Sequence, residues 1–107
     1  MAATLQHNIT TTLTHDLLTV GDNINNVKCM SIANVDSSNA AKVDLFLNKG
    51  ANNYYLLKNV EVPIKTTLIL NAEDNIAFDN SSNGFSLRIQ VDNGSTTAVP
   101  VDVIISR

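Results

Sequence analysis

The sequence is poor in the residues that most often carry chemistry or cross-links. It has one cysteine, two prolines, four glycines and no tryptophan, and only 16% of its 107 residues are charged. A single cysteine cannot form an intramolecular disulfide, which fits a protein assembled in a reducing cytoplasm. The four glycines form no phosphate-binding loop, and no serine lies in a Gly-x-Ser-x-Gly elbow. We therefore expect no enzymatic activity and no cofactor.

Charge of either sign is also sparse. Seven Lys and Arg against ten Asp and Glu give a formal net charge of −3, and the basic residues are scattered along the chain. A protein that neutralises many phosphates needs a basic surface, so we expect no nucleic-acid binding. Apolar runs such as Leu68–Leu70 are far shorter than the roughly 20 residues of a transmembrane helix. Met1–His7 has neither a basic start nor an apolar stretch, so we expect no signal peptide and no membrane association.

Small polar residues take the place of the missing charges. The chain has 15 Asn, 10 Thr and 8 Ser, which together make 33 of its 107 residues. Thr favours strands, Asn and Ser favour turns, and the mixture works against long helices. The length is that of one domain with a core of its own. We expect a single domain over residues 1–107, in which residues 1–12 could form an extended arm because Thr10–Thr12 is polar.

Alternation of apolar and polar residues is the dominant pattern. Every second residue of Phe85–Val91 is apolar, and the residues between them are Ser, Arg and Gln, as in a half-buried strand. The same alternation marks Val43–Leu47 and Val99–Ile105. Because Pro100 has no N–H to donate to a neighbouring strand, we expect the latter strand to begin at Pro100 or to lie at the edge of a sheet. Further strands are expected over Leu5–Leu13, over Val27–Val35 in a central position, over Tyr54–Val62 with a bulge or a solvated middle at Lys58–Asn59, and over Thr66–Leu70.

Turn-forming stretches separate these segments. Asn and Gly tolerate the left-handed backbone that tight turns require. Such stretches lie at residues 21–23, 36–39, 48–50, 79–84 and 92–95. About seven to nine short strands at this spacing predict an all-β fold, an antiparallel β-sandwich of Ig-like or jelly-roll-like type.

One loop matches part of a calcium-binding pattern. Asp79, Ser81 and Asn83, followed by Gly84, correspond to the first half of an EF-hand loop. The last position of that loop would be Gln90, where the pattern needs a bidentate Glu. An Asx-rich hairpin loop explains the same residues. The two histidines and the single cysteine lack the spacing of a zinc site, so we expect no metal.

Outward-facing apolar residues are the one positive hint of an interface. If Val43 and its alternating partners face the core, Phe46 faces away from it. The same alternation places Tyr55 and Leu57 on an outer face. Apolar groups on a second face suggest contact with another subunit, so Phe46, Tyr55 and Leu57 are candidate interface residues. Partial cover by loops is the alternative explanation.

Several stretches share a pattern of small and apolar residues. These stretches are Ser31–Asp36 with Ala41–Leu47, Asn53–Leu68, and Ser86–Ile89 with Val101–Ile105. Over roughly residues 27–107 this pattern resembles that of the small β-sandwich virion proteins of tailed bacteriophages. In that family a bulky stretch like Tyr54–Leu57 precedes a proline-containing turn with a glycine. Here Lys65 stands in place of that glycine after Pro63, which would alter the turn.

The resemblance implies a non-enzymatic phage virion structural protein. The first hypothesis is a capsid decoration or cement protein that stabilises the head by binding the major capsid protein. Such a protein would be assembled in the cytoplasm of the bacterial host, reside in the virion and self-associate, for example as a trimer. A tail, neck or baseplate accessory protein is the alternative within the same class. A carbohydrate-binding or host-adhesion module is the alternative of a different class, although the usual stacking residue, tryptophan, is missing.

Overall fold

Eight β-strands make up the regular structure of the part of the chain that is described. This part is residues 4–24 and 26–106 of a computed structural model, with side chains for all of these except residues 71–77. Among these residues no helix is long and apolar enough to cross a membrane. The strands are β1 (Thr4–Ile9), β2 (His15–Leu18), β3 (Asn26–Asn34), β4 (Ala41–Lys49), β5 (Asn52–Val62), β6 (Thr67–Ala77), β7 (Ser86–Asp92) and β8 (Val101–Ser106).

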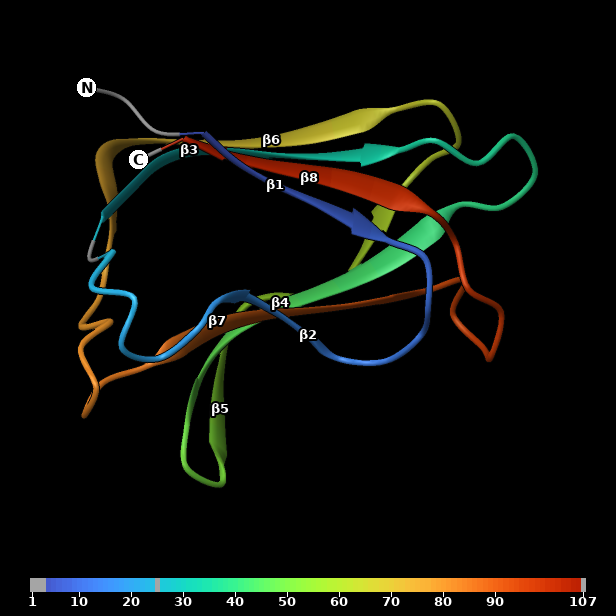
Figure 1. Cartoon of the computed structure of the whole chain (residues 1–107). Helices are drawn as coiled ribbons and strands as arrows, with labels where there is room; N and C mark the ends of the chain where they lie inside the picture. Colours follow the sequence, from blue (N-terminus) through green and yellow to red (C-terminus); the bar gives the residue numbers. More distant parts are fainter. Residues whose placement is uncertain (1–3, 25, 107) are drawn as a thin grey trace.

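The strands form two antiparallel sheets that face each other (Figure 1). The upper sheet has the order β1-β8-β3-β6 and the lower sheet the order β2-β7-β4-β5. β1 pairs with β8, β2 with β7, β3 with β6 and β4 with β5, so the chain resembles one long hairpin wrapped around a common core. This is the strand order of a jelly roll. The predicted all-β antiparallel sandwich is confirmed, and its eight strands fall within the predicted range.

The core lies between the two sheets and consists mainly of Val, Leu and Ile. In β8, Val101, Val103 and Ile105 are completely buried, whereas Asp102 and Ile104 are exposed. This is the alternation that the sequence predicts for the strand. The equivalent residues of the lower sheet are Val43, Leu45, Leu87, Ile89 and Val91. Because a slip of one residue would turn these side chains to solvent, the buried face determines the register.

The N-terminal part of the chain differs from the prediction. A single strand over Leu5–Leu13 is wrong, because β1 ends at Ile9 and a separate strand, β2, begins at His15 in the other sheet. The polar residues Thr10–Thr12 lie in the crossing between the sheets. Thr4–Ile9 pairs with β8 residue by residue, so these residues form an edge strand and not an extended arm.

The centre of the upper sheet is formed by β8 and β3. Val27–Val35 was predicted to be a central strand, and β3 indeed lies between β8 and β6. β8 lies between β1 and β3, so it is not an edge strand. It begins at Val101, directly after Pro100, so the proline lies at the start of the strand, where no N–H is needed for pairing.

One buried side chain, Asn80, ties two connections together. Its side-chain amide donates to the main-chain oxygens of Thr19 (3.1 Å) and Phe85 (2.8 Å). Its side-chain oxygen accepts the N–H of Ile24 at 3.0 Å. Its main-chain oxygen accepts two further N–H groups from the β2–β3 connection. The loop between β6 and β7 is therefore joined to the connection between β2 and β3.

Gly84 lies in the same loop where the backbone folds back on itself. A Cβ atom on Gly84 would lie 2.1 Å from the main-chain oxygen of Asp79, which accepts the N–H of Phe85 at 2.6 Å. Because this backbone would have to shift, we expect Gly84→Ala to lower the free energy of unfolding by about 1–3 kcal/mol in a urea titration. Ser82→Ala, an exposed position of the loop, should change it by less than about 0.5 kcal/mol. Equal stability of the two variants would contradict this loop geometry.

Candidate functional site

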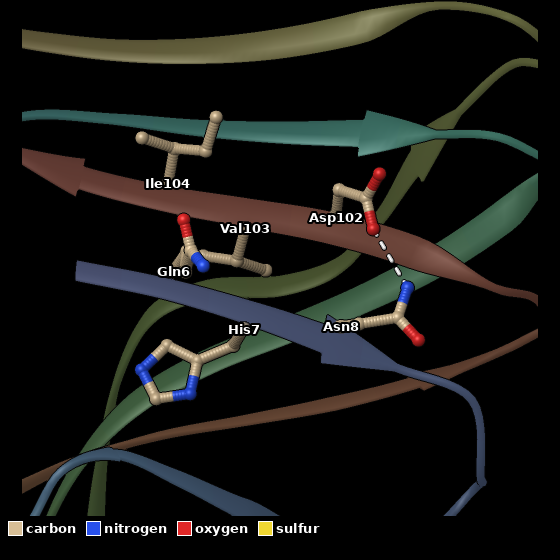
Figure 2. A pocket seen from close by; sticks show the side chains of 6 residues that line it. All are labelled: Gln6, His7, Asn8, Asp102, Val103 and Ile104. Carbon is tan, nitrogen blue, oxygen red and sulfur yellow. Dashed lines mark hydrogen bonds between the residues drawn. The ribbon is translucent and has the colours of Figure 1, made fainter. Parts of the chain in front are cut away.

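A depression lies on the outside of the upper sheet, where the first and last strands meet. Its volume is about 400 Å³. We call it the β1–β8 depression, and Figure 2 shows its side chains. It is lined by Gln6, His7, Asn8, Asp102, Val103 and Ile104.

The alternation of β1 and β8 places the polar groups of this depression. Gln6 is opposite Ile104 and Asn8 is opposite Asp102 in the antiparallel register. The side-chain amide of Asn8 donates to a carboxylate oxygen of Asp102 at 2.7 Å (Figure 2). His7 is half-buried and points toward the lower sheet in the same view. The depression thus presents an ordered carboxylate–amide pair beside an exposed aliphatic side chain.

These groups are suited to binding by hydrogen bonds. A carboxylate, two amides and an imidazole supply donors and acceptors, and Ile104 supplies a small apolar contact. The six lining residues include no hydroxyl, thiol or amine side chain.

The β4–β5 hairpin is the second candidate surface. Its tip extends away from the rest of the lower sheet (Figure 1). Three consecutive residues of β5 are exposed, namely Tyr54 (54%), Tyr55 (45%) and Leu56 (42%), and we call them the hairpin surface. The Tyr54 ring meets the Phe85 ring edge to face at 6.0 Å, and the Tyr55 ring lies 5.1 Å from that of Phe46. These contacts hold the two tyrosine rings in place while much of their surface stays in solvent.

The three predicted interface residues lie close together on this hairpin but differ in their exposure. Phe46 lies outside the core cluster, yet only 4% of it is exposed because the Tyr55 ring packs against it. Tyr55 is exposed. The prediction that Leu57 faces away from the core is wrong, since Leu57 packs against the core opposite Leu45. A register shift between Leu45 and Phe46 places Tyr55 and Leu57 on opposite faces.

A second irregularity of β5 is the bulge predicted at Lys58–Asn59, which is confirmed by the register shift there. Asn59 is left-handed, with a φ of 54°, and its N–H donates to a carboxylate oxygen of Asp44 at 2.6 Å. The Lys58 ammonium lies 3.4 Å from the other oxygen of Asp44 and 4.5 Å from the centre of the Tyr55 ring. The negative charge of Asp44 raises the pKa of Lys58 above its ordinary value. Asp44 therefore holds the bulge at Lys58–Asn59 in place.

The polar loop at residues 79–84 is explained by its own turns. The N–H of Ser81 donates to the Asp79 carboxylate at 3.0 Å, and hydrogen bonds from the side chain and backbone of Ser81 lower the pKa of Asp79. Within the described residues, no group of three or more His, Cys, Asp or Glu side chains is placed to hold a metal ion. Glu73 and Asp74 precede this loop and were expected to add oxygen ligands if the loop folded back, but they lie outside the described side chains.

Comparison with known proteins shows the fold of the chain. No family model matches the sequence, and no curated protein matches it. Among solved structures, the crystal structure of the Yersinia pseudotuberculosis-derived mitogen is similar, with a TM-score of 0.51 and 14% sequence identity. The match covers 99% of this chain and 85% of that chain. At this identity the likeness concerns the fold alone, and the chain shares the β-sandwich of that mitogen over almost its whole length.

Proposed function

We propose that this protein is a non-enzymatic structural protein of a phage virion, and specifically a decoration protein that binds the major capsid protein on the head. The observation that carries the proposal is the exposure of apolar side chains on two separate surfaces of one small jelly roll. One is the hairpin surface on the lower sheet. The other lies on the outside of the upper sheet, where Ile69 and Ile104 are 60% and 46% exposed.

The second surface combines two exposed isoleucines with two small residues. Ser31 of β3 stands between Ile69 of β6 and Ile104 of β8 in the register, and the next position along β3 with the same orientation is Ala33. We call these residues, with Asp102, the outer sheet face. Exposed apolar side chains on a face whose five named residues carry one charge, that of Asp102, are typical of a surface that packs against another protein.

Contact surfaces on two sheets suit a protein that bridges neighbours in a lattice. A decoration protein must touch the capsid, and it gains strength when its copies also touch each other. Each contact can be small, because many copies linked in one array raise the overall avidity. An eight-stranded sandwich presents the two surfaces at fixed positions, which keeps the cost of ordering them low.

The turn between β5 and β6 supports the resemblance to phage virion proteins. Lys65, which stands in place of the glycine of that family, has a φ of 55°. This is the left-handed region, which glycine enters more easily than other residues. The turn therefore adopts, at this position, a conformation for which a glycine would be well suited.

Binding to particles tests the proposal. We expect the purified protein to co-sediment with particles of the phage that encodes it after the native copies are removed. The double variant Ile69→Lys/Ile104→Lys should bind at least about tenfold more weakly, because it places two charges in a contact that buries apolar groups. The matched control is Leu13→Lys/Val35→Lys, which adds the same charges at two other exposed apolar positions.

Particle composition gives the contrary outcomes. If mass spectrometry finds the chain in no fraction of purified particles, the virion proposal is wrong. If it is found in tails but not in heads, the protein belongs to the tail, neck or baseplate alternative. Equal binding by the two double variants would remove the outer sheet face from the contact.

A further inference from the structure

Asp102 carries the one charge of the outer sheet face and also lines the β1–β8 depression. It lies on β8, two residues before Ile104, and both side chains are exposed because the alternation of the strand turns them away from the core. The neighbours of Asp102 in the register are Asn8 of β1 and Ala33 of β3. The carboxylate therefore has an amide on one side, a small apolar residue on the other and an isoleucine of its own strand beside it.

The negative charge of Asp102 is not balanced by a cation within the described part of the chain. Three ion pairs are found there, all between neighbouring strands of the lower sheet. They are Lys42–Glu61, Lys58–Asp44 and Arg88–Asp16, with separations of 2.9, 3.4 and 2.6 Å. The Asp102 side chain has an uncharged partner instead, the Asn8 amide at 2.7 Å. A cation for this carboxylate has to come from a molecule that contacts the upper sheet.

The carboxylate is oriented and accessible. The Asn8 amide donates to one oxygen of Asp102, and the second oxygen points away from Asn8 (Figure 2). An ionised carboxylate can accept about four hydrogen bonds, so one donor leaves most of its capacity to a partner. The depression beside it, with a volume of about 400 Å³, has room for a side chain.

We propose that the β1–β8 depression binds an arginine side chain of the protein that covers the outer sheet face. The guanidinium group would lie on the Asp102 carboxylate, and the aliphatic part of the arginine would lie along Ile104. The inference rests on the proposed function and deepens it, since the covering protein is then the major capsid protein.

The geometry favours arginine over lysine. The planar guanidinium presents several N–H donors that fit both oxygens of a carboxylate, so it can bind Asp102 while Asn8 keeps its hydrogen bond. It is also more weakly hydrated than an ammonium group and loses less when a contact excludes water. Asp102 and Ile104 are two residues apart on the same face of a strand, which is roughly 7 Å. The methylene groups of an arginine can cover the isoleucine over this length while its charge reaches the carboxylate.

The expected effect depends on the exclusion of water. An ion pair that stays exposed to solvent contributes little to binding. Inside a protein contact, removal of one charge leaves the other without its partner in a dry environment, so the loss is larger. Ile69 and Ile104, which are exposed on the same face, supply the apolar surroundings that exclude water. We therefore expect a strong effect of Asp102 on binding to particles and a weak affinity for a free arginine derivative.

Co-sedimentation of Asp102→Asn with depleted particles tests the charge. The variant keeps the size of the side chain and an oxygen that can accept the N–H of Asn8. We expect it to bind at least about tenfold more weakly than the unchanged chain. The matched control Glu61→Gln removes a negative charge from the lower sheet and should bind like the unchanged chain. Equal binding by the two variants would overturn the inference and leave the capsid proposal intact.

An NMR titration of the isolated chain tests the depression without particles. N-acetyl-arginine amide should cause saturable shifts of the Asn8 side-chain NH₂ signals and of the Ile104 N–H signal, with a Kd of about 1–10 mM for a single side chain. The exposed Asn53 amide on the lower sheet should not shift. N-acetyl-citrulline amide has the same length without the charge, and with it, or with Asp102→Asn, the shifts should fall at least about tenfold.

The two proposals can fail separately. Equal shifts with the arginine and citrulline derivatives, or no shift at the highest arginine concentration, would refute the arginine site whatever the particles show. If the unchanged chain does not co-sediment with particles, the capsid proposal is wrong, and the titration still decides whether the depression binds arginine.

Discussion

Replacing Asn80 with alanine is expected to lower the free energy of unfolding by about 3–5 kcal/mol. Asn80 is completely buried, and its side chain makes hydrogen bonds to Thr19, Ile24 and Phe85. Alanine would leave these three main-chain groups without their partner, and each such loss costs about 1–3 kcal/mol when the group is shielded from water. The hydrogen bonds from Gly21 and Asn23 to the main-chain oxygen of Asn80 also join the two connections, and alanine would keep them, so the expected loss reflects the three side-chain hydrogen bonds alone.

Thermal and urea unfolding followed by circular dichroism would measure this effect. A loss of this size corresponds to a fall in Tm of more than about 10 °C for a domain of this length. Asn83→Ala is the matched control, because it is the same substitution at an exposed position of the same loop. If Asn80→Ala is as stable as Asn83→Ala, the hydrogen bonds of Asn80 do not hold the two connections together. The variant Asn80→Asp keeps the acceptor and removes the donors, so an intermediate loss would show how the effect is divided.

Replacing Leu45 with alanine is expected to lower the free energy of unfolding by about 2–5 kcal/mol. Leu45 is completely buried, and its register partners on either side are Leu57 and Ile89. The substitution loses the transfer free energy of the removed methyl and methylene groups and leaves a cavity between the sheets. Because Leu45 belongs to the central strand pair of the lower sheet, its surroundings are held from both sides and can collapse only partly.

Leu13→Ala is the matched control for this prediction. The same atoms are removed, but Leu13 is 68% exposed, so the change should stay within about 0.5 kcal/mol. Urea titration of both variants, with unchanged dependence on urea concentration, would give the two free energies directly. Similar losses for the two leucines would mean that Leu45 does not occupy the core described above.

Much of the strand pattern could be predicted from the sequence. Phe85–Val91 and Val99–Ile105 alternate so regularly that one buried face is the only arrangement that keeps their apolar side chains from water, and both segments contain the expected strands. The bulge at Lys58–Asn59 was visible because two polar residues interrupt an apolar strand. In contrast, β2 was missed, because four residues that follow a run of threonines are too short to show a period.

The candidate surfaces could be predicted only in part. Tyr55 is exposed as its alternation with neighbouring residues indicated, but Leu57 turns inward because a register shift reverses the alternation between the two. The alternation of residues within β5 cannot predict such a register shift, because the shift depends on how β5 pairs with β4. The β1–β8 depression was not predicted at all, because Asn8 and Asp102 are 94 residues apart in the sequence. Only the pairing of the first and last strands brings them within hydrogen-bond distance.

The sequence by itself determined the all-β class, the location of most turns and the faces of the regular strands. These are local properties, since the alternation of side chains along a strand and the backbone preferences of Asn and Gly act within a few residues. Tertiary structure alone decided the pairing of β1 with β8, the inward position of Leu57 and the role of Asn80 as a buried link. Each of these depends on contacts between segments that are far apart in the chain, and the residue pattern of a single segment contains no information about its partner.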